Sequence, residues 1–234
     1  MNEFTIGLAV YDFVPVIFTA VALFFIARLV QQAGAGQNAV VLAYVGGALV
    51  TVGGFLKALW KLQMALSGQD VLWMANALFP LMAPGFALLA TAVWSARRQQ
   101  KGKSAPGFIW FITLGVIGLV YALALLRMSQ GIERGWFMPI MSLASIANLS
   151  LTVMLMLEAG QRRKWWLALL FVVNLAMVFA LQQIAQIEPM TIALHWFEQT
   201  LTSVGAGAFA LASYLLYRLV TADAPLTSGQ PALA

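Results

Sequence analysis

The 234-residue sequence has no cysteine and a single histidine. The lack of cysteine excludes disulfides, thiolate metal sites and a cysteine nucleophile. One histidine excludes a bis-histidine haem and any metal centre that takes several histidines from one chain. Walker loops and glycine-rich dinucleotide fingerprints are absent, and so is a lysine in the last apolar segment that would bind retinal. The sequence therefore leaves the cofactor unassigned.

Charged residues are also scarce. They make up 9% of the chain, whereas 62% of its residues are hydrophobic and the mean hydropathy is +0.88. Soluble domains carry about 25% charged residues, because their surface must be wetted. We therefore predict an integral, multi-pass membrane protein whose surroundings are a lipid bilayer, and we expect a prokaryotic cytoplasmic membrane. The net charge of +5 is explained by membrane topology, so it does not indicate a nucleic-acid partner.

Seven apolar stretches are long enough to cross a bilayer as helices, since about 20 residues span its hydrocarbon core. The connections between them are too short for an extramembrane domain. We predict an all-α bundle of seven transmembrane helices over residues 1–221 and a disordered cytoplasmic tail over 222–234. The predicted spans are Thr5–Val30, Ala39–Leu66, Val71–Ala96, Gly107–Arg127, Trp136–Gly160, Lys164–Gln186 and Thr191–Val220.

The distribution of basic residues predicts how the chain is oriented. Basic loops face the cytoplasm in most membrane proteins. This rule puts the N-terminus outside and the C-terminus inside, because the basic residues gather after spans one, three, five and seven. They are Arg28, Arg97, Arg98, Lys101, Lys103, Arg162, Arg163, Lys164 and Arg218.

A few ionisable residues lie within the predicted spans. Each costs about 2.5–3.5 kcal/mol to insert, so it is expected to face the protein interior and to have a partner. Four come from spans one, two and seven at a similar depth in the outer half, and an asparagine of span three joins them. These candidate site residues are Asp12, Lys57, Asn76, His195 and Glu198, with Trp60, Trp73 and Trp196 as the rim of a pocket.

Helical spacing indicates which way some of these residues point. Gly46, Gly53 and Lys57 share one face of span two. Glycine allows a neighbouring membrane helix to come close, so Lys57 is expected to point into the bundle. Span three contains Pro80 and Pro84, which lack backbone donors and free carbonyl groups. The polar residues concentrate in the outer half, which favours an outward-facing pocket over a continuous pore.

Structural roles for the same residues remain open alternatives. Asp12 and Lys57 would form an ion pair that fixes helix register, and His195 with Glu198 would form a hydrogen-bonded core pair. Lys61 lies near enough to the interface to snorkel.

Three functions follow from these observations. The first is binding of a small solute or ion by a transporter or sensor, with Lys57 holding an anionic or carboxylate-bearing ligand and Asp12 and Glu198 compensating its charge. The alternative is a non-catalytic structural or accessory subunit, whose partners are other membrane subunits. The third is an intramembrane enzyme that modifies a lipid, with His195 and Glu198 as acid and base. The lack of a catalytic motif favours a non-enzymatic protein.

Overall fold

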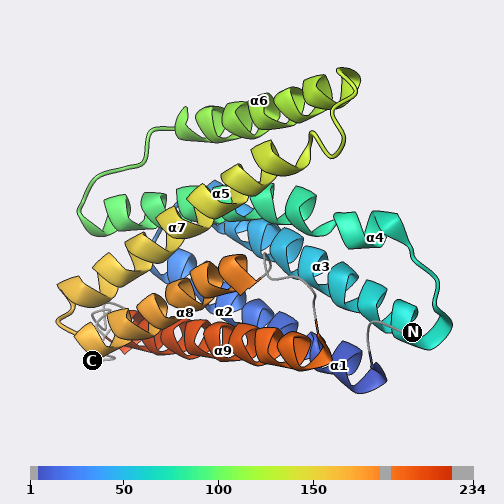
Figure 1. The fold of residues 1–234 in the computed structure, drawn as a ribbon. Helices are drawn as coiled ribbons and strands as arrows, with labels where there is room; N and C mark the ends of the chain where they lie inside the picture. Colours follow the sequence, from blue (N-terminus) through green and yellow to red (C-terminus); the bar gives the residue numbers. More distant parts are fainter. Residues whose placement is uncertain (1–4, 185–190, 223–234) are drawn as a thin grey trace, which may run out of the picture.

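The computed structural model describes residues 5–184 and 191–222 (Figure 1), and every regular element within these ranges is an α-helix. The helices are α1 (Ile6–Tyr11), α2 (Phe13–Gln32), α3 (Gln37–Ser67), α4 (Leu72–Asn76), α5 (Leu78–Gln100), α6 (Ile109–Ser129), α7 (Phe137–Gln161), α8 (Trp165–Ile184) and α9 (Ile192–Ala222).

These helices confirm the predicted membrane bundle. Six helical segments of the described chain are long and apolar enough to cross a membrane, two of them formed by α1 with α2 and by α4 with α5. The remaining predicted span, the sixth, corresponds to α8, of which the stretch Trp165–Leu181 is apolar. The end of the predicted sixth span at Gln186 and the predicted tail beyond Ala222 lie outside the described residues. The protein is therefore a helical integral membrane protein.

Two of the spans are interrupted near a proline. The first divides at Asp12, three residues before Pro15, and the third divides at Ala77, three residues before Pro80. Proline has no backbone N–H, so the carbonyl four residues earlier loses its intrahelical donor. That carbonyl belongs to Tyr11 in the first case, immediately before Asp12. The interruptions therefore follow from local sequence, and the first one sets the position of a buried carboxylate.

A third proline frees a carbonyl that another helix satisfies. Pro84 lies inside α5, and its missing N–H leaves the Pro80 carbonyl without an intrahelical donor. The hydroxyl of Tyr121 in α6 donates to this carbonyl. The hydrogen bond ties α6 to α5 at the point where α5 is weakened.

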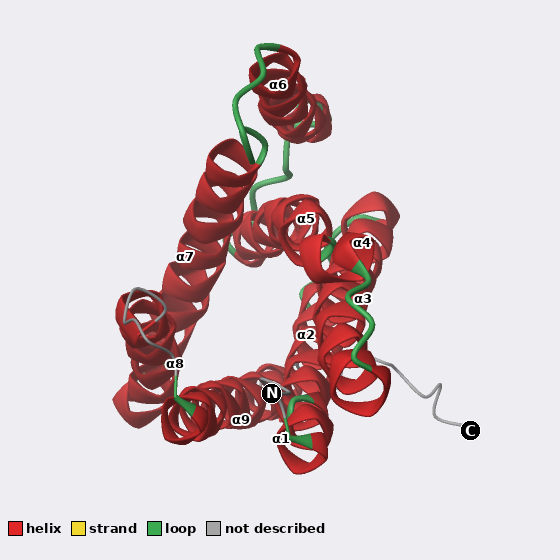
Figure 2. Cartoon of the chain, turned by 45° about the vertical axis from the view of Figure 1, so that its right-hand side comes forward, coloured by secondary structure: helices red, strands yellow, loops and turns green. Residues whose placement is uncertain are grey.

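The spans form a ring with one helix outside it. Figure 2 shows α2, α3, α5, α7, α8 and α9 following one another around the bundle, and each packs against the next. Helix α6 lies outside this ring beside α5 and α7. Only 6% of the most apolar window of α6 is buried, so most of its apolar surface faces away from the protein.

The closest helix packing is between α3 and α5. A Cβ atom added to Gly46 would lie 2.6 Å from the Gly85 carbonyl oxygen, and one added to Gly85 would lie 2.7 Å from that of Gly46. One added to Gly53 would lie 3.0 Å from the Leu78 carbonyl oxygen. The glycine face of the second span therefore packs against a neighbouring helix, as its sequence predicts.

Candidate functional site

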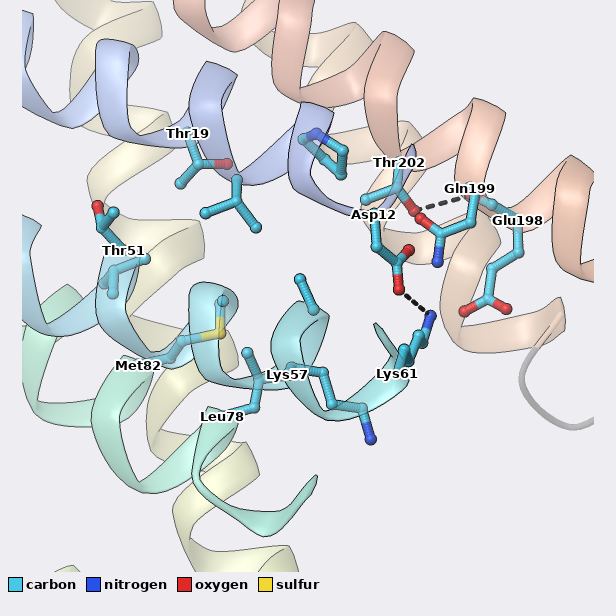
Figure 3. A pocket seen from close by; sticks show the side chains of 15 residues that line it. Asp12, Thr19, Thr51, Lys57, Lys61, Leu78, Met82, Glu198, Gln199 and Thr202 are labelled. Carbon is cyan, nitrogen blue, oxygen red and sulfur yellow. Dashed lines mark hydrogen bonds and ion pairs between the residues drawn. The ribbon is translucent and has the colours of Figure 1, made fainter. Parts of the chain in front are cut away.

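A cavity of about 300 Å³ lies between α2, α3, α5 and α9, and we call it the charged cavity (Figure 3). Its wall carries four ionisable side chains, together with hydroxyl and amide groups and apolar groups such as Val16, Leu78 and Met82. The polar lining residues are Asp12, Thr19, Thr51, Lys57, Lys61, Glu198, Gln199 and Thr202.

Asp12 forms a buried ion pair in the wall of this cavity. Its Oδ2 lies 2.7 Å from Nζ of Lys61, and the side chains are 7% and 12% exposed. The sequence suggests Lys57 as the ion-pair partner of Asp12, and a snorkelling role for Lys61. The observed Asp12–Lys61 pair corrects both expectations. Lys57 and Lys61 are one helical turn apart, so an error of about 5.4 Å in depth is enough to exchange them. Span boundaries read from hydropathy are uncertain by that much.

Lys57 lies in the same cavity but has a different environment. Its Nζ is 4.0 Å from the centroid of the Trp60 ring, which is cation–π geometry. Figure 3 shows the Lys57 ammonium group apart from the Asp12–Lys61 pair. Among the described residues, no carboxylate oxygen lies within 4.0 Å of this ammonium group. Lys57 thus contributes a half-buried positive charge that is held by an aromatic face.

Trp60 is fixed in place by a second interaction. Its indole Nε1 donates to Oδ1 of Asp70 at 2.8 Å. Asp70 lies in the connection after α3, so this bond fastens the connection to the end of the helix. The orientation of the ring that contacts Lys57 is therefore fixed by a hydrogen bond of its own.

Helix α9 supplies the opposite wall through Glu198, Gln199 and Thr202. The Thr202 hydroxyl donates to the backbone carbonyl of Glu198 at 2.8 Å. Figure 3 shows the Glu198 carboxylate on the side of α9 that faces Asp12 and Lys61. His195 Nδ1 lies 3.6 Å from Glu198 Oε2, beyond hydrogen-bond length. The expected His195–Glu198 proximity is present, although His195 is not part of the cavity wall.

The other candidate residues lie outside the charged cavity. Asn76 is the last residue of α4, and the helix is interrupted directly after it. The prediction that Asn76 faces the charged residues assumes an unbroken helix, so it fails at this position. Trp73 is 65% exposed and Trp196 is 39% exposed, and Trp196 packs against Tyr11 in a tilted arrangement with ring centroids 5.7 Å apart. The structure therefore brings together Asp12, Lys57 and Glu198 of the predicted set, and adds Trp60 through its contact with Lys57.

Several wall residues were missed by the sequence analysis. Thr19 lies seven residues after Asp12, and Pro15 three after it, so helical spacing places all three on one face. Gln199 is 5% exposed and directly follows Glu198, so helical spacing does not place the two residues on one face. The first two had a readable signal, whereas Gln199 did not.

Two further cavities continue from the charged one. A middle cavity of about 210 Å³ lies between α2, α5, α7, α8 and α9, and an apolar cavity of about 290 Å³ lies between α5, α7 and α8. Asn148 lines both, and Asn174 lines the middle cavity. Polar residues in the middle of spans five and six therefore face interior space.

A second buried carboxylate lies at the opposite end of the bundle. Glu158, in the last turn of α7, is 5% exposed. Its Oε1 is 3.0 Å from Nε of Arg162, and its Oε2 is 3.6 Å from Nε of Arg97. Arg97 also donates through a terminal nitrogen to the Met154 carbonyl at 2.9 Å. We call these residues the Glu158 cluster. The sequence analysis did not single out Glu158, although its spacing of four from Arg162 is a recognisable pairing signal.

The charged cavity combines an ammonium group held by an aromatic ring with a carboxylate that is already paired. Within residues 5–184 and 191–222, no three His, Asp or Glu side chains gather closely enough to hold a metal ion. Comparison of the chain with protein-family models, with curated proteins and with solved structures gives no match.

Proposed function

We propose that this membrane protein binds a small anionic solute, of the carboxylate-bearing class, in the charged cavity and serves as a transporter or sensor for it. The observation that carries the proposal is the environment of Lys57. Its ammonium contacts the Trp60 ring at 4.0 Å inside a cavity, and within the described part of the chain no carboxylate is close enough to pair with it. A charge in this setting interacts strongly with an anion, because little water screens it.

The neighbouring charges favour a ligand with a single negative charge. The Asp12–Lys61 pair is neutral as a unit, so it adds little net field to the cavity. Glu198 on the α9 wall repels a second negative charge on the ligand. The hydroxyl group of Thr19 lines the same space and is able to donate a hydrogen bond to a carboxylate, whereas those of Thr51 and Thr202 donate to carbonyls of their own helices.

The basic residues indicate from which side of the membrane the ligand reaches the charged cavity. Arg97, Arg98, Arg162 and Arg163 lie at the end of the bundle opposite to the charged cavity. If that end faces the cytoplasm, as basic residues usually do, the charged cavity belongs to the outer half of a prokaryotic cytoplasmic membrane. The ligand then enters from outside.

Native mass spectrometry of the mildly solubilised full chain tests the proposal. We expect a small-molecule adduct on the wild type that is lost in Lys57→Ala. Lys101→Ala is the matched control, because Lys101 is exposed at the C-terminal end of α5, and it should keep the adduct. An adduct that survives in Lys57→Ala overturns the proposal. Stoichiometric partner chains without any adduct overturn it in favour of an accessory subunit.

A further inference from the structure

We infer that the ligand is an anionic amphiphile, with its charged head at Lys57 and a single apolar chain that runs through the middle cavity into the apolar cavity. This inference rests on the proposed function and names the substrate class of the same site.

The cavities share their walls in a definite order. Met82 of α5 lines all three of them. Thr19 and Thr202 line both the charged and the middle cavity. Phe86 and Val178 line both the middle and the apolar cavity. The interior space therefore passes from the charged cavity, along Met82, to the space between α5, α7 and α8.

Polarity falls along this path. The charged cavity has four ionisable wall residues, and the other two have none. The wall of the apolar cavity includes Phe79, Phe86 and Phe179, and its polar side chains are Ser145 and Asn148. A head that carries charge fits one end of such a path, and a hydrocarbon chain fits the other, because burying a charge without a partner is strongly unfavourable.

The apolar cavity reaches the lipid-facing surface of the bundle. Three of its wall residues are well exposed, namely Ile146 at 64% and Leu149 at 39% on α7, and Phe179 at 51% on α8. In a bilayer this surface contacts hydrocarbon. A lateral apolar opening is of no use to a hydrophilic solute, whereas a lipid-soluble molecule can enter and leave through it.

The sizes agree with such a ligand. Small-molecule sites have volumes of about 300–1,000 Å³, and the charged cavity of about 300 Å³ is at the lower limit by itself. The apolar cavity adds about 290 Å³ at the end that has no charge. The extra space accommodates a chain rather than a second head group.

Photo-crosslinking of the full chain in phosphatidylcholine vesicles tests this inference. The probes are a long-chain fatty acid with a diazirine near its terminal methyl group, an alkyl phosphate of the same length, and a four-carbon carboxylic acid with the same diazirine. Labelled residues are mapped by peptide mass spectrometry. The exposed face of α6, at Phe111 and Leu119, is the internal control for contact with bulk lipid.

We expect at least one long-chain probe to label Ala144, Leu175 and Leu181 in a saturable way, since these residues line the apolar cavity in which the end of the chain lies. This labelling should fall about tenfold or more in Lys57→Ala, because one charge-assisted contact is lost, and should persist in Lys101→Ala. Labelling of α6 should be unsaturable and equal in all variants. The head group, carboxylate or phosphate, is identified by whichever long-chain probe labels at the lower concentration.

A second variant blocks the path without touching the charge. Val178→Trp fills the boundary between the middle and the apolar cavity without lining the charged cavity, so long-chain labelling should be lost while the short acid still labels the charged cavity. Val178→Ile nearly conserves volume and should behave as the wild type. Lys57-dependent labelling by the short acid alone overturns the amphiphile and leaves the proposed function intact. If no probe shows Lys57-dependent labelling, both fail.

Discussion

The two ends of the bundle each bury a carboxylate, but they pair it differently. Asp12 is 6% exposed and Glu158 is 5% exposed, and they lie near opposite ends of the helices (Figure 1). Glu158 pairs with Arg97 of α5 and with Arg162 at the end of α7, whereas Asp12 pairs with one basic residue of the described chain, Lys61, beside a cavity. The Glu158 cluster links α7 to α5 through ion pairs. In the charged cavity, by contrast, Lys57 has no carboxylate of the described chain within 4.0 Å.

The choice of basic residue fits this difference. Arginine has a planar fork of donors that can bridge a carboxylate and a backbone carbonyl, as Arg97 does between Glu158 and Met154. Lysine carries a compact charge on a flexible stem, which is suited to an exchangeable ligand. A comparison of stability with ligand binding at the two ends therefore separates the two roles.

The largest effect on stability is expected from Glu158→Gln. This change leaves Arg97 and Arg162 without their shared carboxylate, and removing one partner of a buried ion pair costs about 3–5 kcal/mol. The free energy of unfolding in mixed detergent micelles measures it. Arg163→Gln, at the neighbouring position, is the control and should change stability by less than about 0.5 kcal/mol. Equal values for the two variants would contradict a stabilising role of the Glu158 cluster.

A somewhat smaller loss is expected from Lys61→Met, toward the lower end of the same range. The substitution leaves Asp12 buried without its partner at 2.7 Å. The double variant Asp12→Asn with Lys61→Met should recover most of this loss, because neither charge then remains uncompensated. The same unfolding measurement applies. Additive losses in the double variant would show that the pair is not coupled.

The smallest effect on stability is expected from Lys57→Met, one turn away on the same helix. It removes a cation–π contact, worth about 0.5–1 kcal/mol, and leaves no carboxylate of the described chain unpaired. Unfolding should therefore change by about 1 kcal/mol or less, while the adduct seen by native mass spectrometry is lost. A destabilisation as large as that of Lys61→Met would make Lys57 a structural residue and remove the contrast between the two lysines.

The helical membrane bundle could be predicted from the sequence because the bilayer imposes length and hydropathy on every span. The predicted start at Ala39 and the observed start of α3 at Gln37 differ by two residues. Gly46 and Gly53 also carried a readable signal, since only a residue without a side chain tolerates the approach of α5. Depth, apolar length and the need for close packing are local properties, and local sequence determines them.

The pairing of side chains was decided by the tertiary structure. Asp12 pairs with Lys61 rather than with Lys57 because of the position of α1 along the axis of α3. The two lysines are one helical turn apart, which is no more than the uncertainty of a predicted span boundary. The Glu158 cluster depends on the position of Arg97, 61 residues earlier in the chain, relative to α7. The continuity of the three cavities along Met82 requires six helices to close a ring. Sequence sets how deep a residue lies in the membrane, and only helix packing sets which residues meet at that depth.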